Sequence, residues 1–221
     1  MNEIFETADG SKSLISENFG VSYHSKHGAI QETEHVFIKA ALEERARTLS
    51  DISLLDIGFG TGLNAIMAFQ WANTNKKKIH YTGIEAYPID IETAISMDYP
   101  NALGMTEALD TPFKNMHKAE SGKKIELSPY FSFEKIIQTF EEIKSIDAFD
   151  VIFFDAFAPN AQPDLWEVDL LQKMYVALKM DGILTTYCAK GQVKRNLKSI
   201  GFKIEALPGP PGKREMTRAK K

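Results

Sequence analysis

Short apolar runs alternate along this chain with stretches in which apolar residues recur at helical spacing. The alternation is typical of an α/β protein whose mostly parallel sheet is covered by helices on both faces. The runs predict strands near residues 53–57, 79–85, 124–129, 149–155, 182–188, 202–207 and 215–219. The helical spacing predicts helices near 31–48, 63–73, 90–96, 133–144, 164–179 and 190–199. We interpret 97–120 as irregular, with room for a short helix, because Pro100, Gly104 and Pro112 interrupt it.

The last two predicted strands are joined by the run Pro208-Gly209-Pro210-Pro211-Gly212. No helix fits in that connection, so these strands should be antiparallel neighbours. We therefore expect a seven-stranded, mostly parallel sheet with one antiparallel strand at the C-terminal end. A Rossmann-like sheet of this kind is usual in methyltransferases that use S-adenosyl-L-methionine, whereas an NAD-binding sheet more often continues with another crossover helix.

The size of the chain suits one large domain with a small extension. Its 221 residues are interpreted as an N-terminal cap loop and helix (1–50) followed by a methyltransferase domain (51–221). The chain contains no run of 18 apolar residues, and its first residues lack the features of a signal peptide. A single cysteine, Cys188, excludes an internal disulfide and favours the cytoplasm.

Charge is distributed unevenly along the chain. The formal net charge is −4, yet residues 188–221 contain ten Lys or Arg and only two Glu. A basic C-terminal region on an acidic body suits a polyanionic partner. The alternative interpretation is an ordinary solvated surface.

The stretch from Leu54 to Asn64 combines an apolar strand, an acid, alternating glycines and the start of a helix. Such a turn lets a ligand approach the backbone closely, and the helix N-terminus points its free N–H groups at the same place. The run from Gly60 to Ala65 also fits the dinucleotide pattern G-x-G-x-x-A. Asp56 favours S-adenosyl-L-methionine, because an acid suits the amino group of methionine better than it suits a pyrophosphate.

Two further acids end predicted strands. Glu85 follows the apolar run at 79–84, 23 positions after Gly62, where a carboxylate can bind both hydroxyls of a ribose. Asp155 ends the buried run 150–155 and precedes Ala156-Phe157-Ala158-Pro159. Ligands of open α/β sheets lie beyond the carboxyl ends of the strands, so Asp155 should point into the same crevice and hold an acceptor amine. The alternative is that Asp155 caps the next turn.

The polar stretch from Tyr23 to Glu32 precedes an amphipathic helix and is predicted to be a loop that folds over the cofactor. The spacing of His24, His27 and His35 could indicate a metal site, but no cysteine or acid pair accompanies these histidines. We predict no metal.

Taken together, these motifs resemble the methyltransferase half of the bifunctional bacterial enzyme that completes 5-methylaminomethyl-2-thiouridine at the tRNA wobble position (MnmC-like). The matching elements are the glycine turn, Glu85 with Pro88, Asp155 to Pro159, Pro163-Asp164-Leu165-Trp166, Gly212-Lys213-Arg214-Glu215-Met216 and Gln31-Glu32-Thr33. Two departures are that no residues remain for the FAD-dependent oxidase domain, and that Tyr130-Phe131-Ser132-Phe133 lacks an acid common in the family.

The resemblance implies a stand-alone methyltransferase that methylates the amine of 5-aminomethyl-2-thiouridine, with a separate FAD oxidase acting upstream. Asp155 would orient the amine and also contact the cofactor. Lys213 and Arg214 would bind tRNA near the anticodon. The remaining cofactor-binding residues would be Asp56, Gly58, Phe59, Gly60, Gly62, Asn64 and Glu85. The alternatives are methylation of a small-molecule or protein amine, an NAD-linked oxidoreductase or nucleotide-binding module, and aminopropyl transfer to a polyamine.

Overall fold

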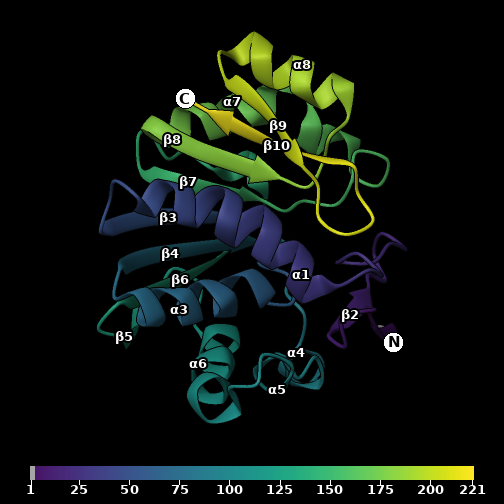
Figure 1. Cartoon of the computed structure of the whole chain (residues 1–221), viewed down its shortest axis with the longest axis vertical. Helices are drawn as coiled ribbons and strands as arrows, with labels where there is room; N and C mark the ends of the chain where they lie inside the picture. Colours follow the sequence, from purple (N-terminus) through teal and green to yellow (C-terminus); the bar gives the residue numbers. More distant parts are fainter. Residues whose placement is uncertain (1–2) are drawn as a thin grey trace.

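The computed structural model describes residues 3–221 and is organised around an eight-stranded sheet (Figure 1). The strand order is β5-β6-β4-β3-β7-β8-β10-β9. The strands are β3 (Asp51–Ile57), β4 (Lys78–Glu85), β5 (Ile125–Ser128), β6 (Phe131–Ile137), β7 (Phe149–Phe154), β8 (Leu178–Thr186), β9 (Lys203–Pro208) and β10 (Glu215–Lys220). Strands β6, β4, β3, β7 and β8 are parallel, so their carboxyl ends meet at one edge of the sheet.

Two strands run against this direction. Strand β10 lies between β8 and β9 and is antiparallel to both, which confirms the hairpin predicted from the Pro- and Gly-rich connection. Strand β5 is antiparallel to β6. The expected α/β fold is confirmed, whereas the expected count of seven strands with one antiparallel strand is corrected to eight with two.

The helix predicted for 133–144 is wrong. Residues 131–137 form β6, which pairs in parallel with β4, and only the short 3-10 helix η2 (Phe140–Glu142) follows. Phe131 and Phe133 are buried on the same face of this strand, and Tyr81 of β4 packs against both rings. Sheet pairing and aromatic packing therefore override the helical spacing read from the sequence.

The prediction of an irregular 97–120 is also wrong, because this segment contains α5 (Tyr99–Ala102) and α6 (Thr106–Lys118). Helix α6 buries Leu109, Phe113 and Met116, which recur at helical spacing on one face. Pro112 lies inside the helix and removes one backbone donor. The burial of the apolar face outweighs this interruption.

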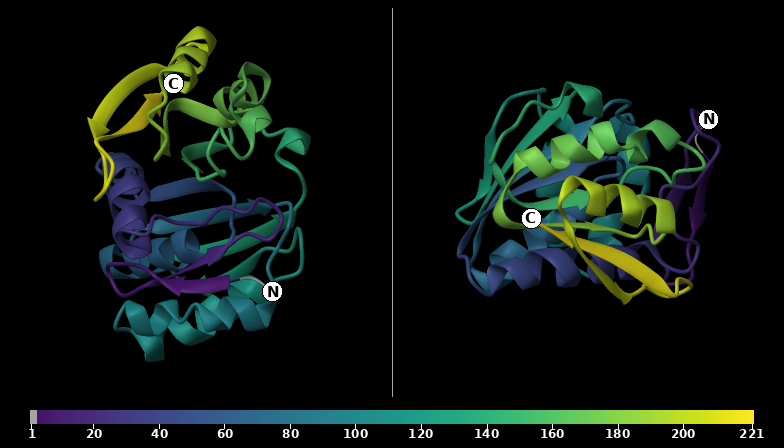
Figure 2. Two further views of the ribbon diagram at one scale, coloured as in Figure 1. Left: turned by 90° about the vertical axis from the view of Figure 1, so that its right-hand side faces the viewer. Right: turned by 90° about the horizontal axis from the view of Figure 1, so that it is seen from above.

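Helices cover both faces of the sheet (Figure 2). One face is covered by α3 (Leu63–Asn75), α6 and a continuous helix made of α1 (Ala29–Thr33), the π-helix η1 (Glu34–Glu43) and α2 (Glu44–Ala46). The other face is covered by α7 (Val168–Ala177) and α8 (Gly191–Ile200). The smaller elements are the hairpin β1 (Glu3–Glu6) and β2 (Lys12–Ile15), the helix α4 (Ile91–Ser96) and the 3-10 helix η3 (Pro163–Trp166).

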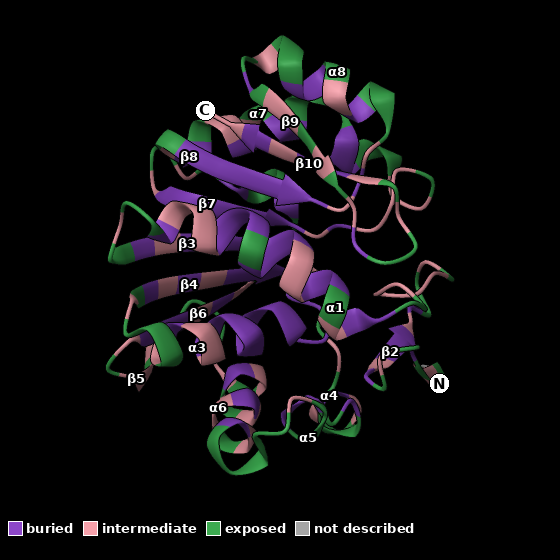
Figure 3. Ribbon diagram, in the orientation of Figure 1, coloured by how far each residue is buried: buried purple, intermediate pink, exposed green. Residues whose placement is uncertain are grey.

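Neighbouring residues of the central strands contribute side chains to two separate apolar cores, one on each face of the sheet. Leu54 and Phe153 belong to the core beneath η1 and α3, whereas Leu55 and Phe154 belong to the core beneath α7 and α8. All six residues of β7 are buried, as the purple centre of Figure 3 shows. This two-sided burial fixes the carboxyl ends of the strands, where the candidate site residues lie. Within residues 3–221, the structure has no helix of the length and apolarity that a membrane span requires.

Candidate active site

The glycine turn lies between β3 and α3, as the sequence predicts. Gly58 has φ 93°, and a Cβ there would come within 2.9 Å of the backbone oxygen of Asp155. Gly62, at φ 80°, precedes the first residue of α3. A side chain is therefore disfavoured at Gly58 both by the left-handed backbone and by the neighbouring strand end. The turn thus packs directly against the end of β7.

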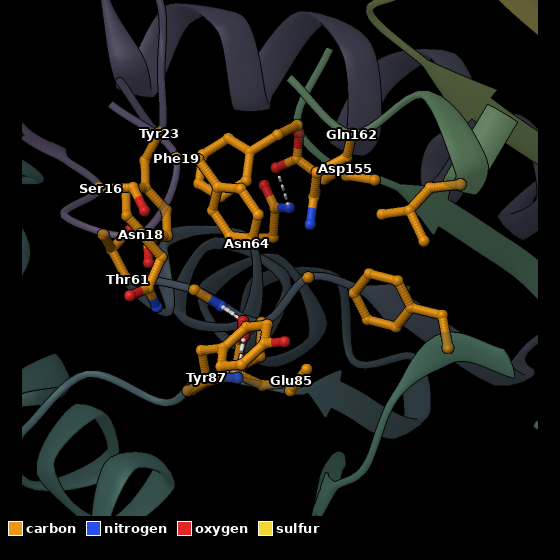
Figure 4. A pocket seen from close by; sticks show the side chains of 18 of the residues that line it. Ser16, Asn18, Phe19, Tyr23, Thr61, Asn64, Glu85, Tyr87, Asp155 and Gln162 are labelled. Carbon is orange, nitrogen blue, oxygen red and sulfur yellow. Dashed lines mark hydrogen bonds between the residues drawn. The ribbon is translucent and has the colours of Figure 1, made fainter. Parts of the chain in front are cut away.

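A cavity opens above this turn, shown in Figure 4. We call it the main cavity; it encloses about 870 Å³ including its open mouth. It is lined by the turn, by the segments after β4, β6 and β7, and by the N-terminal segment. The lining residues used below are Phe19, Tyr23, Gly58, Phe59, Gly60, Asn64, Glu85, Tyr87, Phe140, Glu141, Asp155 and Phe157. A concave site with aromatic walls and a few fixed polar groups is typical of small-molecule binding.

Glu85 presents a fixed carboxylate to the main cavity. One oxygen accepts the N–H of Gly60 and the other accepts the N–H of Tyr87, both at 2.8 Å. The side chain is 8% exposed. Each carboxylate oxygen keeps a second lone pair, so Glu85 retains the capacity to accept two ligand hydroxyls.

Asp56 lies behind the wall of the main cavity rather than on it. It is fully buried and accepts hydrogen bonds from the Tyr81 hydroxyl at 2.5 Å and from the Asn64 amide at 3.4 Å. Burial raises the pKa of the Asp56 carboxyl well above its usual range. The sequence places Asp56 against the methionine amino group, whereas the structure directs its carboxylate toward Tyr81 and Asn64.

Asn64 connects the acids of the site. Its amide nitrogen donates to Asp155 at 2.9 Å and also faces Asp56, while its oxygen accepts from the Thr33 hydroxyl at 3.0 Å. Burial, and then the nearby Glu32 carboxylate, raise the pKa of Asp155 to about 7. A carboxyl that titrates near neutral pH suits proton exchange with an acceptor group.

A second cavity of about 520 Å³, its mouth included, adjoins the first. Tyr23, His24 and Asp155 line both, so Asp155 lies at the junction between them. The second cavity is otherwise lined by Ser22, Ser25, Glu32, Thr33, Phe37, Tyr187 and Lys213. Among the residues that the structure describes, Asp155 is therefore the one acid in the lining of both cavities, and its carboxylate contacts Asn64 of the main cavity.

The two predicted tRNA contacts have different surroundings. The Lys213 ammonium forms an ion pair with Glu32 and lies 3.9 Å from the centre of the Tyr187 ring. Arg214 is exposed. Elsewhere in the basic region, Lys194 pairs with Glu215 and Lys221 with Asp147, so the local excess of positive charge is partly neutralised.

Several lining residues were missed by the sequence analysis. Phe19 and Asn18 precede the loop that the sequence singled out, and Tyr187 follows β8 without a glycine or an acid to mark it. Glu32 belongs to a motif that the resemblance used, but its position in the second cavity depends on a contact across 181 residues. Local sequence patterns do not predict a contact between residues so far apart in the chain.

Comparison with known proteins gives a consistent result. The family model described as S-adenosyl-L-methionine-dependent methyltransferase matches residues 105–221. A curated relative from Marinomonas sp. (strain MWYL1), named tRNA 5-methylaminomethyl-2-thiouridine biosynthesis bifunctional protein MnmC, is 28% identical over 91% of this chain and 31% of its own length. The protein of the same name from Pseudomonas aeruginosa (strain UCBPP-PA14) is 31% identical over 91% of this chain and 32% of its own length. The chain thus spans about a third of the length of these relatives.

Among solved structures, a crystal structure described as MNMC2 from Aquifex aeolicus is 27% identical, with a TM-score of 0.76 over 99% of this chain and 69% of that one. Spermidine synthase from Thermotoga maritima, 15% identical, shares the fold with a TM-score of 0.55 over 100% of this chain and 71% of that one. The matched family uses S-adenosyl-L-methionine, so the interpretation of this chain as a dinucleotide enzyme is wrong. With the family model covering more than half of its residues, this chain belongs to the S-adenosyl-L-methionine-dependent methyltransferase family.

Proposed function

We propose that this chain transfers a methyl group from S-adenosyl-L-methionine to the amine of 5-aminomethyl-2-thiouridine at the tRNA wobble position. The observation that carries the proposal is the position of Asp155 at the junction of two cavities. One cavity suits a nucleoside cofactor, and the other suits the acceptor. The MnmC relatives and the MNMC2 structure support the choice of acceptor.

The residues of the main cavity fit the cofactor. Glu85, with two free lone pairs, would accept the ribose hydroxyls, and the aromatic side chains of Tyr87, Phe140 and Phe157 would face the adenine. Gly58 and Gly60 would let the cofactor approach the turn closely, beside Phe59 and with Asn64 and Asp155 at the inner end. Gly62 lies outside this lining, because a Cβ there would meet His117, Phe113 and Phe59. We assign Asp56 the indirect role of positioning Asn64.

The reaction is a methyl transfer in which the amine lone pair forms the N–C bond and the electron pair of the C–S bond stays on the cofactor sulfur. The contribution of this chain is alignment, because the methyl group is already activated by the positive sulfur. Alignment of two reactants can supply up to about 7–11 kcal/mol of a barrier. Asp155 orients the amine toward the main cavity.

We propose that the described part of the predicted cap, residues 3–50, closes the site; residues 1–2 of that prediction lie outside the described residues. Tyr23 and His24 line both cavities, and Tyr23 packs against Phe157 with ring centres 5.0 Å apart. The helix that follows is anchored in the same core as α3. This arrangement would exclude water from the reacting groups, which strengthens the electrostatic contacts between them.

The acceptor amine has to be produced by an earlier reaction. The curated relatives are described as bifunctional. We infer that an FAD-dependent oxidase supplies the amine, by releasing it from a larger substituent on the same nucleoside.

The test is mass analysis of wobble nucleosides from cells with and without this protein. We expect the unmethylated aminomethyl nucleoside to accumulate in the deletion strain and to disappear when purified protein and S-adenosyl-L-methionine are added to its tRNA. Unchanged nucleosides, together with normal binding of the cofactor, would assign the methyltransferase to a small-molecule or protein amine instead.

Arg214 should contact tRNA phosphate, because it is exposed next to a residue that lines the second cavity. Arg214→Ala should weaken binding of bulk tRNA severalfold and lower the slope of log affinity against log salt by about 0.7 to 1. Fluorescence anisotropy across a salt titration measures both. The matched control is Lys220→Ala, since Lys220 already pairs with Glu205. Equal losses in the two variants would show only a general effect of charge.

A further inference from the structure

The second cavity already contains one ammonium group. Lys213 reaches into it from the β9–β10 hairpin, pairs with Glu32 and lies over the Tyr187 ring. Glu32 is 5% exposed, and its other carboxylate oxygen accepts the Ser25 N–H at 2.9 Å. Both oxygens of Glu32 are therefore engaged, and the Lys213 charge is fixed inside the wall of the cavity.

We propose that the second cavity is the site of the acceptor alkylamine, and that Lys213 acts there as a fixed positive charge that favours the neutral, nucleophilic form of the amine. Glu32 is the positioning residue that holds Lys213. This inference rests on the proposed function for the identity of the amine. It moves Lys213 from the predicted phosphate contact to the reacting centre, and leaves Arg214 on the tRNA side.

Methyl transfer requires the acceptor amine in its neutral form, and a fixed positive charge favours that form. An alkylamine is mostly protonated at neutral pH, as the lysine reference pKa of about 10.4 indicates, and a protonated amine has no lone pair for attack. A neighbouring cation and burial both disfavour the charged form of an amine. Lys213 and the walls of the second cavity supply both effects.

The second cavity also supplies an acceptor for the proton that the amine loses. Asp155 lines the same cavity and its carboxylate can take the proton, which leaves the lone pair on nitrogen. The methylated product leaves as a secondary ammonium, and Asp155 then returns its proton to solvent. One proton is released for each methyl group transferred, so atoms and charge balance.

The other titratable groups facing this cavity remain neutral near pH 7. Burial lowers the pKa of His24 to about 4, so the ring is uncharged. Burial raises the pKa of Tyr23 to about 12 and that of Tyr187 well above its usual range. The charges next to the acceptor amine are therefore Asp155, Glu32 and Lys213.

The experiment compares Lys213→Met with Arg214→Met, two adjacent residues that lose the same charge. Single-turnover methylation of tRNA is followed from pH 6 to 10, and tRNA affinity is measured across a salt titration. For Lys213→Met we expect unchanged affinity and salt slope, a rate at pH 7 lowered by about tenfold, and a half-maximal pH raised by about one unit. Glu32→Gln should shift the half-maximal pH by less than Lys213→Met does, because it removes the partner that holds Lys213 and also a negative charge that favours the protonated amine. For Arg214→Met we expect weaker binding with a smaller salt slope, and the wild-type half-maximal pH.

Lys213→Arg separates charge from folding, because it should restore the wild-type pH profile whereas Lys213→Met does not. The proposal is overturned if Lys213→Met loses affinity and salt slope and keeps the wild-type pH profile. A wild-type protein that binds the cofactor and does not methylate tRNA contradicts the proposed function instead. The amine site is then tested with the nucleoside 5-aminomethyluridine and S-adenosylhomocysteine-loaded protein: affinity should rise from pH 7 to 9, because the bound amine loses its proton, and Lys213→Met should flatten that rise. An identical pH dependence in both proteins overturns the inference.

Discussion

Replacing Asp155 with Asn should lower the single-turnover rate of methyl transfer by about 10²- to 10⁴-fold, the range typical of losing a proton acceptor. Asn keeps the size of the side chain but cannot accept the amine proton. Its amide also cannot accept the Asn64 hydrogen bond with the strength of a carboxylate. The rate is measured with aminomethyl-containing tRNA by mass analysis, and calorimetry with the cofactor measures binding separately.

The control for this variant is Asp169→Asn, an exposed acid in the first turn of α7. It should retain the wild-type rate. An Asp155→Asn enzyme that methylates tRNA within a few-fold of the wild-type rate would remove Asp155 from both the orienting and the proton-accepting role.

The same substitution should stabilise the folded protein in mildly alkaline buffer. Burial, and then Glu32, raise the folded-state pKa of Asp155 to about 7, from its ordinary value of 3.8. Between these values the folded state binds more protons than the unfolded state, so stability falls as pH rises. Asp155→Asn has no charge to bury, and its free energy of unfolding at pH 8 should exceed that of the wild type. Urea melts at pH 5 and pH 8 test this: the advantage of the variant should grow with pH, and a constant difference contradicts it.

Replacing Glu85 with Ala should have the second largest effect, a loss of cofactor affinity of about 10²- to 10³-fold. Charge-assisted hydrogen bonds contribute about 1.5–3 kcal/mol each, and the expected loss corresponds to two of them at the lower end of that range. The substitution removes the proposed ribose acceptor and also frees the N–H groups of Gly60 and Tyr87, which hold the turn in shape. Isothermal calorimetry with S-adenosyl-L-methionine and S-adenosylhomocysteine measures the loss.

Glu141→Ala provides the matched comparison, because Glu141 is exposed at the rim of the same cavity. We expect its affinity to stay within a few-fold of the wild type. An equal loss in the two variants would show that the ribose contact is not specific to Glu85.

Local patterns in the sequence predicted most of the fold. The apolar runs identified the strands that form the centre of the sheet, and the Pro- and Gly-rich connection identified the β9–β10 hairpin. The turn from Asp56 to Asn64 and the acids at 85 and 155 placed three carboxylates near the carboxyl ends of adjacent strands. These predictions were possible because the carboxyl ends of parallel strands meet at the same edge of a sheet. A residue at the end of one such strand is therefore expected to lie close to residues at the ends of its neighbours.

Helix and strand were confused where the local pattern was ambiguous. Residues 131–137 have apolar spacing compatible with a helix, and pairing with β4 decided that they form β6. In α6, Pro112 suggested an interruption, and the burial of Leu109, Phe113 and Met116 decided that the helix continues. In both segments the deciding energy comes from residues far away in the sequence.

The sequence by itself determined the fold class, the edge of the sheet where we propose that the chemistry occurs and the acids at that edge. Only the tertiary structure decided the direction of each carboxylate: Asp56 toward Tyr81, Glu85 toward the backbone of the turn, and Asp155 toward Asn64 in the wall that both cavities share. It also decided that Lys213 meets Glu32 across 181 residues. The physical reason is that a strand end is fixed by local propensity and burial, whereas the partner of a side chain is fixed by how distant segments pack.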